Sequence, residues 1–265
     1  LPIGKLHTDA SYLACARKLL DAPDAVFPQF ATHNARSLAA IHVMAGPVAD
    51  PVAEARALCL PGRPHDGIAL PRDLFGKART NSKGLDLSDE SRLAALVGAL
   101  GAGSRQPLHA APLLATDEAE GERREIRNPA DRRELVGHVI EATPATVEAA
   151  RAAAAAAAPA WAATAPAGRA AILERAADLM EFRMPEFLGP VLRDAGKSLP
   201  NAIGEVREAV DFLRYYAAGV RDGFGNEPHR PLSVVACISP WNFPLAIFTG
   251  QVAAALAAGN AVLAK

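Results

Sequence analysis

Residues 232–265, LSVVACISPWNFPLAIFTGQVAAALAAGNAVLAK, decide the fold class of this chain. The continuous apolar run LSVVACISP is typical of a strand buried on both faces, and NFPLAIFTGQVAAALAAGN is typical of a helix. Gly259 and Asn260 indicate the helix stop, after which AVLAK begins a second strand. A strand, a helix and a strand with short links predict a βαβ unit, and therefore an α/β domain with parallel strands and a right-handed crossover.

Polar side chains follow both predicted strands, at the edge where parallel sheets bind ligands. Asn242 carries an amide NH₂ that could stabilise an oxyanion in acyl transfer, and Pro240 and Pro244 stiffen its loop. Trp241 offers a flat face to a ring, and the ammonium of Lys265 could bind ribose hydroxyls or a phosphate. Taken singly, these residues also allow plainer roles, namely a turn asparagine, a core tryptophan and a solvated surface lysine.

The region before this unit is predicted to contain a hairpin followed by helices. Residues 122–142 form two alternating runs around the turn residues 128–131, which predicts a β-hairpin. Thr143 and Pro144 predict a helix start, and Pro159 is expected to end or kink that helix. Two further helices are predicted before the next long one.

The last of these predicted helices is long and amphipathic, over residues 201–222. Its apolar residues fall on one face, while its charged residues are expected to take the other face. The apolar set is Val206, Ala209, Val210, Leu213, Tyr216 and Ala217.

The front of the chain has a different organisation. Residues 8–20 predict a capped helix, 26–32 a short strand and 36–45 a second helix. Residues 47–112 are rich in proline and glycine and predict a connector that winds over a surface, with one short helix at 88–103. Residues 105–118 are predicted to be loop.

Composition excludes several classes of function. The net charge of −1 gives no electrostatic basis for nucleic-acid binding, and the seven histidines show no metal-ligand spacing. Cys15, Cys59 and Cys237 form no CxxC pattern, which favours a reducing, cytoplasmic compartment. No segment is predicted to span a membrane, and no leader is recognised at the start. Cys237 lies within the apolar strand run, so we expect a small buried hydrophobe there and not a nucleophile.

The motif ISPWNFP followed by ALAAGNAVLAK resembles the aldehyde dehydrogenase superfamily. Earlier stretches resemble the amino-terminal half of that family, so that the resemblance covers roughly residues 110–265. These stretches are NPAD with LVG, RAAILERAADLME, RDAGKSL and EVREAVDFLRYYA. TDASYLACARKLLDAPDAVFPQFATHNARSLAAI resembles part of the flavin-dependent proline dehydrogenase barrel, and HDGIALPRDLFGKARTNSKGLDLSDE resembles the connector between the two modules. This order is similar to that of the bifunctional proline utilisation A family. Its members oxidise proline to pyrroline-5-carboxylate on FAD and glutamate semialdehyde to glutamate on NAD.

The resemblance implies roles for particular residues. Asn242 would be the oxyanion-hole amide of aldehyde oxidation, and Lys265 would hold the adenosine ribose of NAD. The NAD groove would be lined by Ile238, Ser239, Pro240 and Trp241. In a complete barrel, FAD would lie beside Thr32, His33 and Asn34, and Tyr12 would face the proline side of the flavin site.

The resemblance also divides the chain. Residues 1–46 would be a small remnant of a (β/α)8 barrel, 47–112 the connector, and 113–265 the amino-terminal part of the Rossmann-like NAD-binding domain. A barrel takes roughly 200 residues or more, and two family segments are expected to be joined directly near residue 46. The family's cysteine nucleophile and glutamate base would follow Lys265. We therefore expect a piece of a longer enzyme that has neither activity alone.

Two alternatives remain at this stage. The chain could be part of a monofunctional aldehyde dehydrogenase with an unrelated front end. It could also be a non-catalytic protein whose helical region 143–220 packs against a partner. A homo-oligomer is possible in either case, and the substrate in the enzymatic readings is a small molecule.

Overall fold

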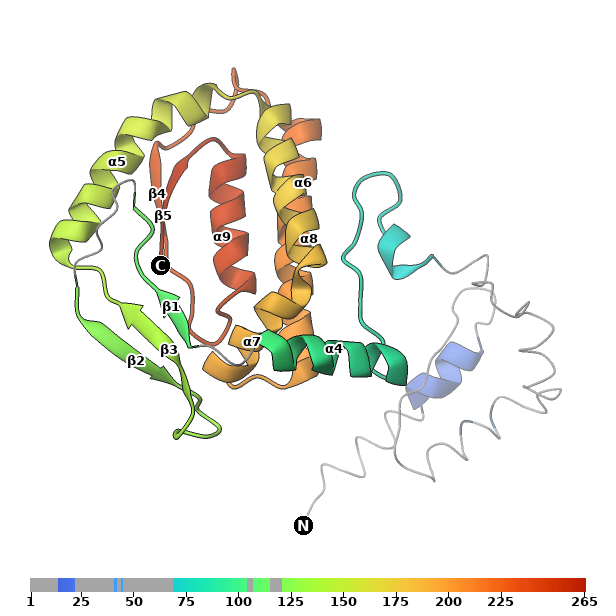
Figure 1. The fold of residues 1–265 in the computed structure, drawn as a ribbon. Helices are drawn as coiled ribbons and strands as arrows, with labels where there is room; N and C mark the ends of the chain where they lie inside the picture. Colours follow the sequence, from blue (N-terminus) through green and yellow to red (C-terminus); the bar gives the residue numbers. More distant parts are fainter. Residues whose placement is uncertain (1–13, 22–40, 42–43, 45–68, 104–106, 115–120) are drawn as a thin grey trace, which may run out of the picture. The chain divides into compact units, whose positions relative to one another are not determined.

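The computed structural model describes residues 14–21, 41, 44, 69–103, 107–114 and 121–265. Contacts divide the chain into two units, Leu1–Ile68 and Ala69–Lys265. In the first unit residues 14–20 are helical, in agreement with the predicted helix at 8–20, and residues 41 and 44 are helical as well. The predicted strand at 26–32 lies outside the described residues. The elements that follow all belong to the second unit (Figure 1).

The predicted βαβ unit is confirmed. Strand β4 (Val234–Cys237), helix α9 (Ala246–Ala257) and strand β5 (Ala261–Ala264) follow one another along the chain. The two strands pair in parallel, from Val234 opposite Ala261 to Cys237 opposite Ala264. Figure 1 shows this small sheet between α9 and helix α5 (Pro144–Ala163), and both helices contact both strands. The sheet is therefore covered by a helix on each face.

The end of α9 is set by the predicted stop signal. Gly259 has a φ of +86°, and its N–H donates to the carbonyl of Leu256 at 3.0 Å. The N–H of Asn260 donates to the carbonyl of Ala255 at 3.0 Å, which completes a Schellman motif. Oδ1 of Asn260 accepts a hydrogen bond of 2.6 Å from the N–H of Leu232. The same residue thus ends the helix and fixes the chain just before β4.

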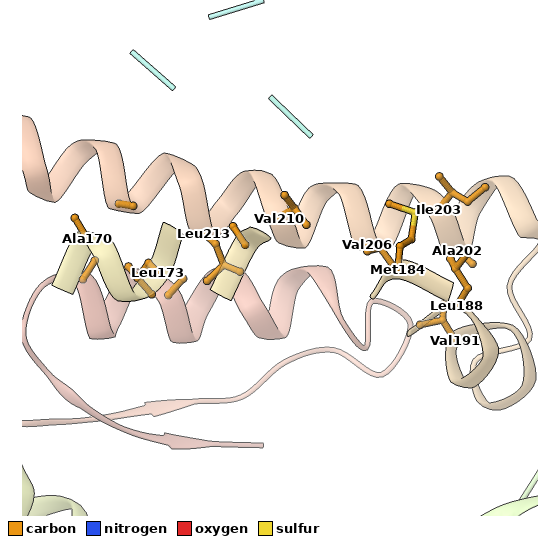
Figure 2. Close-up of a cluster of buried hydrophobic side chains, with 14 of the residues drawn as sticks. Ala170, Leu173, Met184, Leu188, Val191, Ala202, Ile203, Val206, Val210 and Leu213 are labelled. Carbon is orange, nitrogen blue, oxygen red and sulfur yellow. The ribbon is translucent and has the colours of Figure 1, made fainter. Parts of the chain in front are cut away.

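A layer of three helices supports this unit. Helices α6 (Pro166–Phe182), α7 (Met184–Asp194) and α8 (Leu199–Gly223) share one buried core with α9. Figure 2 shows the α7 residues of this core gathered against residues 202–206 of α8, with the α6 residues along the other part of α8. The labelled core residues are Ala170, Leu173, Met184, Leu188, Val191, Ala202, Ile203, Val206, Val210 and Leu213.

Helices α8 and α9 approach each other closely at a glycine. A Cβ atom added at Gly250 would lie 2.9 Å from the ring of Phe212, closer than side-chain atoms tolerate. This close packing holds α9 against the apolar face of α8. The predicted apolar residues of α8 are confirmed as its inner face, since Val206, Ala209, Val210 and Ala217 have no exposed surface.

Helix α5 does not end at Pro159 but continues to Ala163. The prediction that this proline ends the helix is therefore wrong, and its alternative, a kink, stays a prediction. The expectation about the charged residues of α8 is also wrong. The charged residues of α8 are not all on the outer face, since Glu205 is 3% exposed and Arg214 is 8% exposed. Both are buried because they have ionic partners, Lys197 for Glu205 and Asp178 and Glu181 for Arg214.

A second sheet, of three strands, contains the predicted hairpin. Strands β2 (Arg123–Arg127) and β3 (Leu135–Ile140) pair antiparallel, which confirms the hairpin. Strand β1 (Leu108–Ala110) pairs parallel with β3 on its other side, where the sequence predicted only loop. A strand of three residues is too short to show a period, and Gly137 permits its approach because a Cβ there would lie 2.2 Å from the carbonyl oxygen of Leu108.

The connector contains the predicted helix. Helix α4 (Glu90–Gly103) follows a short 3-10 helix, η1 (Pro71–Asp73), and packs against α7. Between them, the backbone N–H and the hydroxyl of Ser82 both donate to the carboxylate of Asp211 at 2.7 Å. The backbone N–H of Lys83 donates to Glu181 at 2.6 Å. These bonds attach the part of the connector just before α4 to α8 and α6.

Candidate functional site

The carboxyl ends of β4 and β5 are joined beyond the last strand residues. The N–H of Lys265 donates to the carbonyl of Cys237 at 2.8 Å, and the N–H of Ser239 donates to the carbonyl of Lys265 at 2.9 Å. The hydroxyl of Ser239 also donates to that carbonyl, at 3.1 Å. Ser239 and Lys265, separated by 26 positions in the sequence, are therefore held side by side at one edge of the sheet.

The residues after β4 form an exposed turn at this edge. Ile238 is 70% exposed and Trp241 is 85% exposed, while Pro240, Asn242 and Lys265 are exposed as well. The N–H of Phe243 donates to the carbonyl of Pro240 at 3.3 Å, which closes the turn around Trp241 and Asn242. Trp241 is thus not a core residue. Its indole and the side chain of Ile238 give the edge apolar surface that could contact a flat ring.

The arrangement brings the predicted NAD residues together. Ile238, Ser239, Pro240 and Trp241 continue directly from β4, and Lys265 lies beside them through its bonds to Ser239. An exposed lysine whose backbone is held beside a turn with exposed apolar residues, at the carboxyl edge of parallel strands, fits a dinucleotide that needs both hydroxyl recognition and ring contact. Asn242 lies four positions before the first residue of α9, in the same turn.

A buried carboxylate lies behind this turn, and sequence reasoning missed it. Glu205 of α8 accepts hydrogen bonds from the N–H groups of Ala246 and Leu245, at 2.9 and 3.3 Å. Its other carboxylate oxygen pairs with Nζ of Lys197. The signal in the sequence is an acidic residue directly before Val206, at the edge of the apolar face of α8.

Cys237 is not suited to be a nucleophile. The thiol is 5% exposed at the end of β4, and burial raises its pKa above the ordinary value for cysteine. A thiol with a raised pKa is mostly protonated at neutral pH, and the thiolate is the nucleophilic form. The expected burial of Cys237 is therefore confirmed.

The residues predicted for the flavin site cannot be placed. Tyr12, Thr32, His33 and Asn34 all lie outside the described residues, so their roles stay predictions. Within the described ranges, no group of three or more histidine, cysteine or acidic residues is arranged to hold a metal ion. Within those same ranges, no helix combines the length and the apolar character needed to cross a bilayer.

The parallel βαβ unit, covered by helices and ending in an exposed polar edge, defines an α/β domain of the dinucleotide-binding class. Residues 116–265 match the sequence profile of the aldehyde dehydrogenase family, and residues 3–60 match that of proline dehydrogenase. The chain belongs to the aldehyde dehydrogenase family, since that match covers more than half of its residues. The expected fold class is thereby confirmed, including the proline dehydrogenase segment at the front.

Relatives combine the two matches in one polypeptide. The bifunctional protein PutA of Escherichia coli K12 is 45% identical over 98% of this chain, and that of Rhizobium meliloti is 46% identical over all of it. A solved structure of 1-pyrroline-5-carboxylate dehydrogenase from Thermus with bound NAD is 31% identical, with a TM-score of 0.62. It covers 69% of this chain, and the match covers 38% of the Thermus chain.

The chain spans about a quarter of the length of the curated relatives it matches, 26% of the E. coli protein and 21% of the Rhizobium protein. The alignment with the E. coli protein covers 344 positions, so at least 79 of them have no residue in this chain of 265. The Rhizobium alignment covers only 271 positions. The E. coli relative therefore carries additional residues inside the matched region, and the direct join near residue 46 stays a prediction.

Proposed function

We propose that this chain contributes part of the NAD site and the oxyanion donor for oxidation of L-glutamate γ-semialdehyde to glutamate in proline catabolism. The observation that carries the proposal is the edge where Ser239 and Lys265 are joined next to the turn of Trp241 and Asn242. The matches to PutA proteins and to 1-pyrroline-5-carboxylate dehydrogenase support the substrate class.

The residues of the edge have distinct roles in this proposal. The ammonium of Lys265 donates to the hydroxyls of the adenosine ribose, and the apolar surfaces of Ile238 and Trp241 contact the flat parts of the dinucleotide. The side-chain NH₂ of Asn242 donates to the aldehyde oxygen and is most useful when that oxygen becomes an oxyanion. NAD, when bound, supplies the hydride acceptor. The cysteine that attacks the aldehyde is not Cys237, because that thiol is buried.

The wider setting is proposed from the same relatives. Residues 1–46 belong to the module that oxidises proline on FAD, with Tyr12, Thr32, His33 and Asn34 near the flavin. The protein acts in the cytoplasm on small-molecule substrates and forms a homo-oligomer.

The test is the substitution Asn242→Ala in the complete gene product that carries this chain. Loss of one oxyanion donor is expected to lower kcat for NAD reduction with glutamate semialdehyde by roughly 10²- to 10³-fold. The affinity for NAD should not change. Asn201→Ala, at an exposed asparagine of α8, is the matched control and should keep full activity. Unchanged turnover in Asn242→Ala would contradict the proposal.

A further inference from the structure

Helix α9 begins without a cap of its own. Its N-cap residue is Leu245, which has no side-chain acceptor, and the first residue of the helix is Ala246. The first N–H groups of a helix need acceptors, since they have no partner inside the helix. Those of Leu245 and Ala246 are satisfied by the carboxylate of Glu205, which is 41 positions away from Ala246 and on a different helix. A negative charge there is also favoured by the helix dipole.

The partner of this carboxylate contacts the turn from another side. The Nζ atom of Lys197 pairs with Glu205 and lies 4.3 Å from the centroid of the Phe243 ring. Phe243 directly follows Asn242. One partly buried ion pair therefore contacts both the residue after Asn242 and the first turn of the helix that follows. The side chain of Lys197 is 16% exposed and that of Glu205 is 2% exposed, so water competes little for these contacts.

The turn is thus held at both ends. At its start, Ser239 is fixed to Lys265 by two hydrogen bonds. At its end, Glu205 fixes Leu245 and Ala246, and between these two anchors lies Asn242. An oxyanion donor is effective only when it is oriented in advance, because reorientation during the reaction has a cost in free energy.

We infer that Glu205 and Lys197 are positioning residues that orient the turn carrying Asn242 by capping α9 from α8. Neither residue touches the substrate. The effect of these residues on catalysis rests on the proposed role of Asn242. The orientation of the turn can be measured independently of that role.

The first measurement is amide hydrogen exchange of the 265-residue chain, resolved by residue. The quantity compared is the exchange rate of the Leu245 and Ala246 amides divided by that of the Ala253 amide, which lies in the middle of α9. In Glu205→Gln this ratio should rise about tenfold, because the two amides lose their hydrogen bonds to a charged acceptor. The ratio removes any effect of global stability. Glu208→Gln, at an exposed glutamate on the same helix, is the control and should leave the ratio unchanged.

A second variant separates positioning from simple loss of stability. Glu205→Gln combined with Lys197→Met removes both buried charges, so its melting temperature should recover relative to Glu205→Gln alone. The exchange ratio at Leu245 and Ala246 should stay high, because the neutral amide oxygen of glutamine accepts hydrogen bonds more weakly than the carboxylate and carries no negative charge at the start of α9. Two results would overturn the inference. One is an unchanged exchange ratio in Glu205→Gln, and the other is a double variant in which the melting temperature and the exchange ratio both return to the values of the unsubstituted chain.

The catalytic consequence is tested in the complete gene product. Glu205→Gln should lower kcat about tenfold while KM for NAD stays the same, and Glu208→Gln should change neither. If Asn242→Ala has no effect on kcat, the proposed function fails, while the exchange ratio still reports whether Glu205 holds the turn. If Asn242→Ala lowers kcat and Glu205→Gln does not, the positioning role is wrong.

Discussion

The guanidinium of Arg169 donates through Nε to the backbone carbonyl of Ala257 at 2.9 Å. Arg169 is 1% exposed and also donates to the carbonyls of Ala162 and Thr164 and to Oδ1 of Asn226. Ala162 lies at the end of α5 and Ala257 is the last residue of α9. One cation thus serves the carboxyl ends of the two helices that cover the two faces of the β4–β5 sheet, where the helix dipoles favour positive charge.

Substitution Arg169→Met should therefore be costly. It removes the side-chain donor to the carbonyl of the buried residue Ala257 and leaves the carbonyls of Ala162 and Thr164 only the long hydrogen bonds from Nδ2 of Asn226, at 3.5 and 3.4 Å. We expect the free energy of unfolding to fall by about 2–4 kcal/mol. Urea denaturation of the chain measures this. Arg175→Met, at an exposed arginine of the same helix, should change stability by less than about 0.5 kcal/mol. Equal losses in the two variants would show that the carbonyl contacts do not matter.

The helix stop of α9 predicts a second effect. Gly259→Ala places a Cβ on a residue with a φ of +86°, and we expect a loss of about 1–2 kcal/mol in the free energy of unfolding. Gly204→Ala, within α8 and with open space around it, should instead stabilise by about 0.5–1 kcal/mol because alanine favours helix. Thermal unfolding of both variants measures these changes in stability. A Gly259→Ala variant that is more stable than the unsubstituted chain would contradict the expected backbone strain at residue 259.

Acid should weaken the contact between α6 and α8. Burial alone would raise the pKa of Glu181, but hydrogen bonds from Arg214 and from the N–H of Lys83 outweigh it and hold that pKa below its ordinary value. The folded-state pKa is then below the unfolded value of about 4.3. The stabilisation is therefore complete above that value and is lost as pH falls through the folded-state pKa.

This dependence can be measured from urea unfolding between pH 3 and pH 7. Glu181→Gln should lower the free energy of unfolding at pH 7 by about 1–2 kcal/mol and reduce its decline in acid. Glu208→Gln is the exposed control. A decline in acid that is as steep in Glu181→Gln as in the unsubstituted chain would assign the acid sensitivity to other carboxyl groups.

The role proposed for Lys265 predicts a separation of kinetic constants. Lys265→Met in the complete gene product should raise KM for NAD about tenfold or more, since hydrogen bonds from a charged donor are lost. The value of kcat should change little, because the ribose is bound equally before and during the reaction. Lys77→Met, at an exposed lysine of the connector, should leave both constants unchanged. A fall in kcat alone would remove Lys265 from the ribose site.

Local signals in the sequence were sufficient for the βαβ unit and the hairpin. The apolar run of β4, the Gly259–Asn260 stop and the alternating runs of residues 122–142 each act within a few residues. Patterns of this length report backbone conformation directly, and the structure bears them out. Strand β1 escaped prediction because its pairing depends on β3 and not on its own three residues.

The sequence by itself therefore determined the fold class and the chemistry offered at one edge, namely the amide of Asn242, the indole of Trp241 and the ammonium of Lys265. Only the tertiary structure decided that Trp241 is exposed and that Glu205 and Arg169 are buried. Glu205 finds its partner Ala246 after 41 positions, and Arg169 finds Ala257 after 88. Helical periodicity indicates which face of a helix a residue occupies. It does not indicate which unpaired backbone groups another element brings to that face, and hydrogen bonds with such groups stabilise a buried charge.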